Sequence, residues 1–206
     1  MIIKSLKPKT QIILKDVCEK VSSIKEGEKI ATQLFEELNS SKTPGIGLAA
    51  NQLGINKRVC VINISEPLFF INPEITERSE ETFVFMEGCL SYPNQYIKTI
   101  RHKWVKVKAD NFDEEIKFDV DTYTELEAKR NEIVTECACI QHEIDHLDGI
   151  TMFDRKYAPQ PIKRAYRKIG RNEKIVIEKD GEQKTLKYKK AEKLMEDDGW
   201  ALVSIV

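Results

Sequence analysis

The sequence predicts an α+β fold, and two observations lead to that class. Short runs with the composition or alternation of β-strands precede a single long apolar helix at about 131–148. Strands that come as a group before a helix, rather than in regular alternation with helices, are typical of α+β proteins. The 206 residues are enough for one domain with a substantial core.

The first predicted element is a helix from residue 23 to about residue 39. Ser23 and Glu26 have the spacing of a capping box, which marks a helix start. Apolar residues then recur at helical spacing, so one face of this helix should point inward. These inward positions are Ile30, Ala31, Leu34, Phe35 and Leu38.

The predicted strands lie between this helix and the long apolar one. Residues 58–64 (RVCVINI) and 69–71 (FFI) are rich in β-branched or aromatic side chains. Residues 104–109 (WVKVKA) alternate apolar and polar side chains, and Asp113 lies in a turn before 116–120. The last two segments therefore predict an antiparallel hairpin.

The long helix at 131–148 carries the most informative motif, QHEIDH. Its positions His142 and His146 are one turn apart, so both imidazoles leave the same face. Glu143 follows the first histidine, which gives the H-E-x-x-H arrangement in which two histidines hold a divalent ion and the glutamate takes a proton from water. The helix is apolar around most of its circumference, which marks it as buried. Buried histidine and glutamate are costly unless paired or coordinated, and this favours a metal site over an exposed polar face.

A third protein ligand is expected, because a catalytic divalent ion usually takes three and leaves a position open. Residues 87–91 (EGCLS) offer Cys89 in a segment that Gly88 and Pro93 mark as a loop. A thiolate there would complete a Cys/His/His site. The alternative is that Cys89 is a small buried hydrophobe, as most free cysteines are.

Residues 45–52 (GIGLAANQ) form a glycine-rich segment that lacks both G-x-G-x-x-G and the Walker lysine, so it is not a phosphate-binding loop. Together and in this order, GIGLAANQ, EGCLS and QHEIDH strongly resemble the three motifs of peptide deformylases. The resemblance covers about residues 5–170. It implies antiparallel sheets packed around a central metal-binding helix.

The resemblance also implies an activity and the residues that perform it. The expected enzyme is a metal-dependent hydrolase that removes the N-terminal formyl group from formyl-methionyl nascent peptides and releases formate. The metal ligands that it implies are Cys89, His142 and His146. Glu143 would be the general base and acid, while the Gln52 side-chain amide and the Leu90 backbone N–H would donate to the formyl oxygen.

Substrate contacts are expected around the same motifs. Gly47 lies where the family's backbone approaches the substrate, so a Cβ there would obstruct it. The candidates for an apolar pocket that holds the methionine side chain are Ile46, Thr135, Ala138 and Cys139. For each of these residues, ordinary core packing is the alternative.

Other positions near the motifs either match the family or depart from it. Arg101 resembles an arginine that pairs with Glu87. Tyr92 stands where a smaller aliphatic residue is usual, and Tyr96 lies near a position often held by an arginine at the cleft mouth. Residues 121–131 look longer than the usual link into the metal helix. These departures concern substrate range and leave the reaction type unchanged.

The identity of the metal has two readings. Coordination by one thiolate and two imidazoles suits zinc. The resemblance implies Fe²⁺ as the preferred ion, with Zn²⁺ or Ni²⁺ able to replace it, and these ligands are compatible with such exchange.

The bulk properties predict a cytoplasmic enzyme. There is no signal-peptide apolar region and no apolar run near 18 residues, so neither secretion nor membrane association is expected. The five cysteines have no disulfide-like spacing, which fits a reducing compartment.

The C-terminal part is strongly basic in places. Residues 155–190 contain 13 Lys or Arg and 4 Asp or Glu, a local +9 that leaves −10 for the rest of a chain of net charge −1. Such a segment could bind nucleic acid or an anionic surface, or it could be a solvated charged face. In related deformylases a basic C-terminal helix engages the ribosome, and residues 161–171 could form that helix here.

Beyond residue 171 the match to the family fades. Two strand-like segments, 174–178 and 185–189, flank an Asp-Gly hairpin signal, and a short helix at 191–198 precedes an apolar strand at 200–206. This ββαβ piece looks too short for a core of its own. The expected organisation is therefore a catalytic domain, 1–171, and an extension, 172–206, that packs on it or on a partner.

Two other functions compete with a deformylase. One is a zinc peptidase that uses H-E-x-x-H with Glu173 or Glu178 as an acidic third ligand, which would leave the GIGLAANQ and EGCLS motifs unexplained. The other is a ribosome- or RNA-binding protein on a deformylase scaffold, against which the complete ligand set and Glu143 argue.

Overall fold

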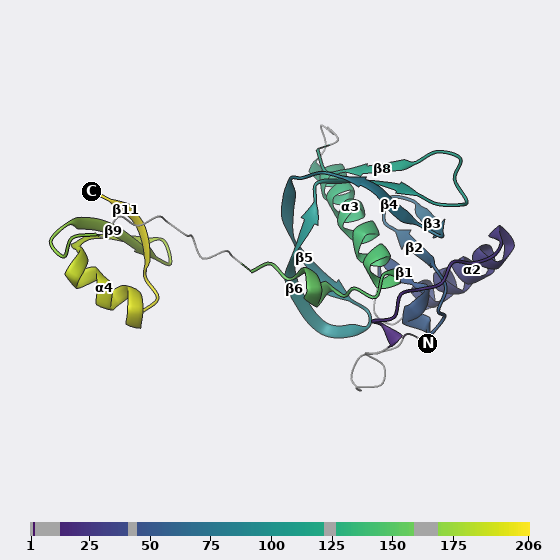
Figure 1. Ribbon diagram of the computed structural model, residues 1–206, viewed down its shortest axis with the longest axis horizontal. Coiled ribbons are helices and arrows are strands. Elements are labelled where there is room, and N and C mark those ends of the chain that lie inside the picture. The colour runs from purple at the N-terminus through teal and green to yellow at the C-terminus, as the bar shows by residue number, and fades with distance from the viewer. Residues whose placement is uncertain (1, 3–12, 41–44, 122–126, 159–168) are drawn as a thin grey trace. The chain divides into compact units, whose positions relative to one another are not determined.

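The structure, a computed structural model, describes residues 2, 13–40, 45–121, 127–158 and 169–206, with the side chains of 127–130 left aside. The chain divides into two compact units, Met1–Ala158 and Pro159–Val206, and each is described by itself. The division falls earlier than residue 171, where the sequence suggested a boundary. Helices and antiparallel sheets make up both units, as the predicted α+β class requires (Figure 1).

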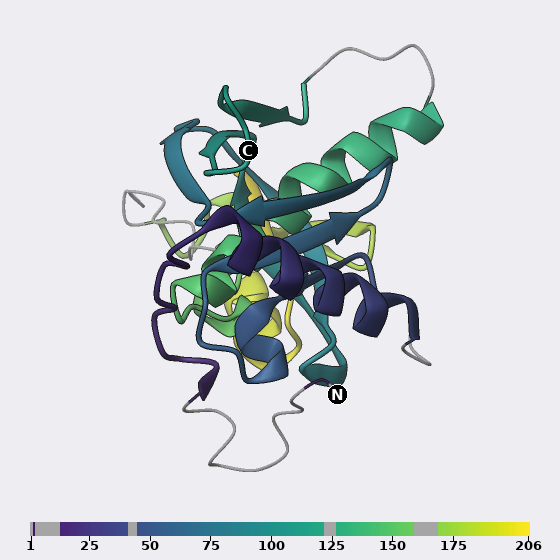
Figure 2. The ribbon, with the colours of Figure 1, turned by 90° about the vertical axis from the view of Figure 1, so that its right-hand side faces the viewer.

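The first sheet is buried on both faces. Its antiparallel strands follow the order β1 (Gly47–Ala49), β2 (Val59–Asn63) and β3 (Pro67–Ile71). One face packs on α3 (Glu127–Leu147) and the other on α2 (Ile24–Ser40); in Figure 2, α2 crosses in front of these strands. The side chains on the α3 face are Cys60, Ile62 and Phe70, and those on the α2 face are Val59, Val61 and Ile71. The strands predicted at 58–64 and 69–71 are confirmed.

The start of α2 departs slightly from the predicted capping box. The Glu26 N–H donates to Ser23 Oγ at 3.3 Å, as expected of an N-cap serine. The Glu26 carboxylate, however, accepts from the Ser22 N–H at 3.0 Å and from the Ser22 hydroxyl, not from Ser23. Four of the five predicted inward positions are buried, and Phe35 is only partly so.

The second sheet contains the predicted hairpin and one strand that the sequence did not reveal. Its order is β4 (Glu74–Arg78), β7 (Trp104–Lys108) and β8 (Ile116–Asp119), all antiparallel. β7 and β8 confirm the predicted hairpin. β4 escaped notice because no residue of this short, charged strand is fully buried.

The prediction of a loop around Gly88 and Pro93 was wrong. These residues lie in a long hairpin made of β5 (Thr82–Cys89) and β6 (Tyr92–His102), with a turn at 90–91. Gly88 pairs with Tyr96, and a Cβ at Gly88 would lie 2.8 Å from Tyr96 Cε1. The glycine therefore gives room to an aromatic ring across the ladder and does not end the strand.

The central helix α3 confirms the helix predicted at 131–148 and begins earlier than expected, at Glu127. It contacts β1 and β2 of the first sheet, β7 and β8 of the second, and β6 of the hairpin (Figure 1). Its buried apolar residues include Cys137, Ile140 and Ile144. Of the long link predicted at 121–131, residues 122–126 lie outside the described part of the chain. The arrangement confirms antiparallel sheets packed around one buried helix.

The second unit has the predicted ββαβ order. Its elements are β9 (Lys174–Lys179), β10 (Glu182–Lys187), α4 (Tyr188–Asp197) and β11 (Ala201–Ile205), with the sheet order β10-β9-β11. Asp180 and Gly181 both have positive φ, 51° and 83°, as a two-residue type I′ hairpin turn requires. The expectation that this piece has no core of its own was wrong, because Ile175, Ile177 and Ala191 are fully buried within one cluster.

Most of the basic helix predicted at 161–171 falls on residues 159–168, outside the described residues. Among the helices that the structure describes, none is long and apolar enough to cross a membrane.

Candidate metal and catalytic centre

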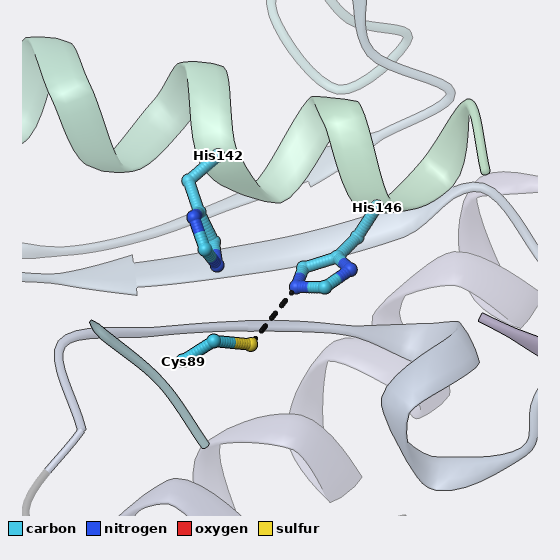
Figure 3. A group of neighbouring side chains, drawn as sticks. All are labelled: Cys89, His142 and His146. Atoms are coloured by element: carbon cyan, nitrogen blue, oxygen red, sulfur yellow. Dashed lines mark hydrogen bonds between the residues drawn. The ribbon is translucent and has the colours of Figure 1, made fainter. Parts of the chain in front are cut away.

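Cys89, His142 and His146 meet at one point of the first unit, as Figure 3 shows. The two histidines project from one side of α3, and Cys89 ends β5. Their candidate ligand atoms all lie within 4.8 Å of one another, and Cys89 Sγ is 3.2 Å from His146 Nε2. One thiolate and two imidazoles form a donor set that suits zinc or ferrous iron.

The orientation of the His142 ring is fixed by a contact at its Nδ1 atom. Its Nδ1 lies 2.8 Å from Glu87 Oε2, a carboxylate that is 5% exposed. A bond at Nδ1 leaves Nε2 as the ring atom available to a metal, which is how carboxylate–histidine pairs usually orient metal ligands.

Glu87 belongs to a buried ionic network. Arg101 donates to both Glu87 oxygens and to Asp145, and Thr99 Oγ1 donates to Glu87 Oε1 at 2.7 Å. Arg155 donates to the other Asp145 oxygen at 2.7 Å. Burial acts to raise the pKa of Glu87, but the hydrogen bonds from Arg101 and His142 hold it well below its ordinary value.

The network contains one predicted pair and two charged residues that were missed. The pairing of Arg101 with Glu87 is confirmed. Asp145 could have been noticed, because it lies inside QHEIDH, three residues after His142 and thus on a neighbouring part of the helix surface. No sequence pattern indicated a role for Arg155, because it reaches Asp145 from the short 3-10 helix Met152–Arg155.

Glu143 is the buried acid of the site. It is 3% exposed, and burial is the main reason that its pKa is raised to about 7. Its Oε2 has no hydrogen-bond partner within the described part of the protein. A buried carboxylate oxygen without a partner calls for a water or a ligand at that point, and the donor set beside it fits a metal centre.

Gly47 is required by the packing of the centre itself. A Cβ at this position would lie 2.7 Å from Cys139 Sγ and closer still to Glu143 Oε1. The strand β1 therefore packs directly against the side of α3 that carries Cys139 and Glu143. The predicted need for glycine here has a cause in the chain's own packing.

Gln52 and Leu90 lie on two segments beside Cys89. The Gln52 side chain is held by the Ala49 N–H, which donates to Oε1 at 2.9 Å. Its Nε2 donates to Ser91 Oγ at 3.0 Å and lies 3.5 Å from Cys89 Sγ. Leu90 follows Cys89 in the turn of the β5–β6 hairpin.

A cleft of about 400 Å³ opens at this centre. All five predicted substrate-contact residues line it, namely Ile46, Gly47, Thr135, Ala138 and Cys139. Tyr92 and Tyr96 line it too, and Tyr96 is 73% exposed. The structure therefore brings the predicted pocket residues, Gln52, Leu90, Glu143 and two of the metal-ligand candidates, His142 and Cys89, into one cavity wall.

Comparison with known proteins gives a consistent result. Residues 3–165 match the family model described as Polypeptide deformylase. The chain is 39% identical over 158 residues to a peptide deformylase from Natranaerobius thermophilus, covering 75% of this chain and 93% of that protein. It is 34% identical over 172 residues to a peptide deformylase from Prochlorococcus marinus, covering 80% and 79%.

Solved structures agree. A peptide deformylase from Synechococcus elongatus in complex with actinonin superposes with a TM-score of 0.62 at 29% identity, covering 77% of this chain and 79% of that one. A probable peptide deformylase from Synechococcus phage S-SSM7 gives 0.58 at 34% identity, covering 75% and 98%.

Proposed function

The chain belongs to the peptide deformylase family, and on this basis we propose which residues carry out the reaction and which metal they bind. Members of this family are metal-dependent hydrolases that remove the N-terminal formyl group from nascent peptides. The observation that supports the assignment most directly is the convergence of Cys89, His142 and His146 beside the unpartnered carboxylate oxygen of Glu143.

The proposed metal ligands are Cys89, His142 and His146. Fe²⁺ is the proposed working ion, with Zn²⁺ or Ni²⁺ as replacements, because a thiolate and two imidazoles accept all three. When bound, such an ion lowers the pKa of water and polarises the formyl carbonyl.

Glu143 is the proposed general base. As a carboxylate it accepts a proton from the water that attacks the formyl carbon, and it then gives this proton to the amine nitrogen as the C–N bond breaks. The products are formate and a free amino terminus. Its burial beside the ligand cluster keeps bulk water away from the proton that it carries.

Gln52 and Leu90 are the proposed donors to the formyl oxygen. Negative charge develops on this oxygen during attack, and an N–H that is already oriented stabilises it without reorganisation. The Ala49 N–H holds the Gln52 amide so that Nε2 faces Cys89. Removing one such donor typically costs about 10²–10³ in rate.

The proposed pocket for the methionine side chain uses Ile46, Ala138 and Cys139. Ala138 and Cys139 are nearly buried, and Ile46 is 46% exposed at the cleft, so the wall is apolar with one open side. Gly47 lets the substrate backbone approach this wall.

The experiment is formate release from formyl-Met-Ala-Ser by anaerobically purified protein loaded with Fe²⁺. Glu143→Ala should lower kcat by about 10²–10⁴ while the metal content stays unchanged. A variant that loses its metal together with its activity would remove the support for a general base. A wild type with full metal and no formate release would overturn the assigned chemistry.

The zinc peptidase reading is not favoured. It needs Glu173 or Glu178 as an acidic third ligand, whereas Cys89 already lies beside the two histidines as a third candidate. Cys89→Ser separates the two readings, because the deformylase assignment expects metal to be lost from this variant.

We also propose that the basic segment 155–190 binds the ribosome. The support is its local charge of +9, which would make binding strongly dependent on salt. Charge reversal at Lys163, Arg164 and Arg167 should weaken sedimentation with ribosomes, while Glu143→Ala should not.

The proposed compartment is the cytoplasm. All five cysteines are free thiols, as a reducing compartment keeps them.

A further inference from the structure

The outward face of the β5–β6 hairpin carries several exposed apolar side chains, although a strand face that meets water is usually polar. The ladder pairs Val84 with Ile100 and Gly88 with Tyr96, so these residues share one face. Exposed fractions are 47% for Val84, 53% for Met86, 73% for Tyr96 and 39% for Ile100. We call these four exposed side chains the outer stripe.

The opposite face of the same hairpin contributes to the buried ionic network. It presents Glu87, Thr99 and Arg101 to the buried network behind His142. Side chains alternate along each strand, so the catalytic network fixes which residues point outward. The outer stripe is therefore held rigidly relative to the metal centre.

The outer stripe is continuous with the catalytic cleft. Met86 and Tyr96 of the stripe also line the cleft, as does Gly88, which Cys89 follows directly in the chain. The Tyr96 ring lies over Gly88, where a Cβ would approach it to 2.8 Å. A chain that leaves the cleft on this side meets Tyr96 and Met86 first.

We propose that the outer stripe binds the residues of the formylated peptide that follow its first two, and that the enzyme prefers apolar side chains there. The inference rests on the proposed function, because the formyl group must be held at the centre. From Gly88 to Val84 the strand rises about 13 Å, the length of about four extended residues. The stripe is thus long enough for positions three to five of a nascent chain.

Lys98 adds a charge preference to the preference for apolar side chains. It pairs with Met86 in the ladder and is exposed on the same face. Its aliphatic stem can cover apolar side chains of the peptide, while its ammonium group disfavours a lysine or arginine there.

The peptide is a better occupant than a second copy of the chain. Four partly exposed side chains offer far less surface than the roughly 800 Å² per partner of a stable interface. The outer stripe is also continuous with the cleft, so a second copy bound to the stripe would obstruct the cleft.

The test compares formyl-Met-Ala-Leu-Leu-Leu with formyl-Met-Ala-Ser-Ser-Ser. Wild-type kcat/KM should be roughly tenfold higher for the leucine peptide, equivalent to about 1.4 kcal/mol. The double variant Val84→Thr/Ile100→Thr should lose this preference and still cleave formyl-Met-Ala at the wild-type rate. Neither residue lines the cleft, and threonine is well accepted in strands.

Ile24→Thr is the matched control. It makes the same chemical change at a side chain that is 40% exposed, on α2, which packs on the first sheet. This variant should keep the wild-type preference.

The outcomes separate the inference from the function on which it rests. Absence of formate from every peptide would overturn the proposed function. Formate from both pentapeptides with equal kcat/KM would overturn the role of the stripe alone, as would an equal loss of preference in Ile24→Thr. A dimer in sedimentation that the double variant abolishes would show a self-interface and would also overturn it.

Discussion

Replacing Arg101 by methionine tests whether the buried network supports both the fold and the metal centre. Arg101 is 2% exposed and bridges two buried carboxylates, Glu87 and Asp145. Methionine keeps much of the volume but leaves Glu87 with His142 and neutral donors only. Breaking a buried pair by removing one partner costs about 3–5 kcal/mol, because an uncompensated charge is left behind. We expect a loss of about 4 kcal/mol in the free energy of unfolding at pH 7.

Arg155→Met is the matched control. It removes the other cation from Asp145, but its side chain is 37% exposed, so solvent already screens the interaction. We expect it to cost about 1 kcal/mol or less.

The pH dependence of the Arg101→Met effect has a defined sign. The pKa of folded Glu87 is held well below its ordinary value, so the carboxylate stabilises the fold above the unfolded-state pKa, about 4.3, and this contribution is lost as the pH falls. Without Arg101 the pKa of Glu87 should rise. The stability gap between wild type and variant should therefore narrow progressively as the pH falls below about 5.

The assay is urea denaturation followed by circular dichroism at pH 7 and pH 4, on metal-free samples. A cost for Arg101→Met no larger than that for Arg155→Met, or a gap that does not change with pH, would refute the reasoning. Metal affinity gives a second readout, since a His142 that loses its orienting network should bind metal about 10–100 times more weakly.

Two further predictions concern the acid of the centre. Glu143→Gln should stabilise the metal-free protein increasingly as the pH rises from about 4.5 to above 7, because burial raises the pKa of Glu143 to about 7 and the ionised carboxylate destabilises the fold. The full effect on the free energy of unfolding, measured by heat or urea, is roughly 3 kcal/mol. An effect confined to acid pH would contradict this prediction. Gly47→Ala should cost about 1–3 kcal/mol in unfolding free energy and should lower kcat with metal content retained, because the added Cβ must displace Glu143 or Cys139. Steady-state kinetics with metal analysis would decide the latter, and an unchanged kcat would show that the contact relaxes without consequence.

The sequence predicted the central helix and its chemistry because both depend on local spacing. His142 and His146 must share a face on any helix, and the apolar surroundings of QHEIDH require burial. Cys89 was a candidate third ligand from its own segment, with a small buried hydrophobe as the alternative, whereas Gln52 was reached only through the resemblance to deformylases. Nothing local in their segments specifies that they meet 3.5 Å apart.

Other parts of the structure could not be predicted because the deciding contacts lie far along the chain. Gly88 was taken for a loop residue, although it makes room for Tyr96 across the ladder. Arg155 is an unremarkable basic residue until the fold brings it to Asp145. In the second unit a helix and three strands bury a small cluster that composition alone did not suggest.

The proposed ligand set joins two elements that the buried ionic network also links, through Glu87 with His142 and Arg101 with Asp145. Cys89 ends the β5–β6 hairpin, and His146 lies 57 residues later on α3. A metal held by both would close that loop as a covalent cross-link does, and a loop of this length corresponds to about 4 kcal/mol of chain entropy. The ion would then stabilise the fold as well as take part in the reaction. Its concentration would set the fraction of the enzyme that is folded in a cell.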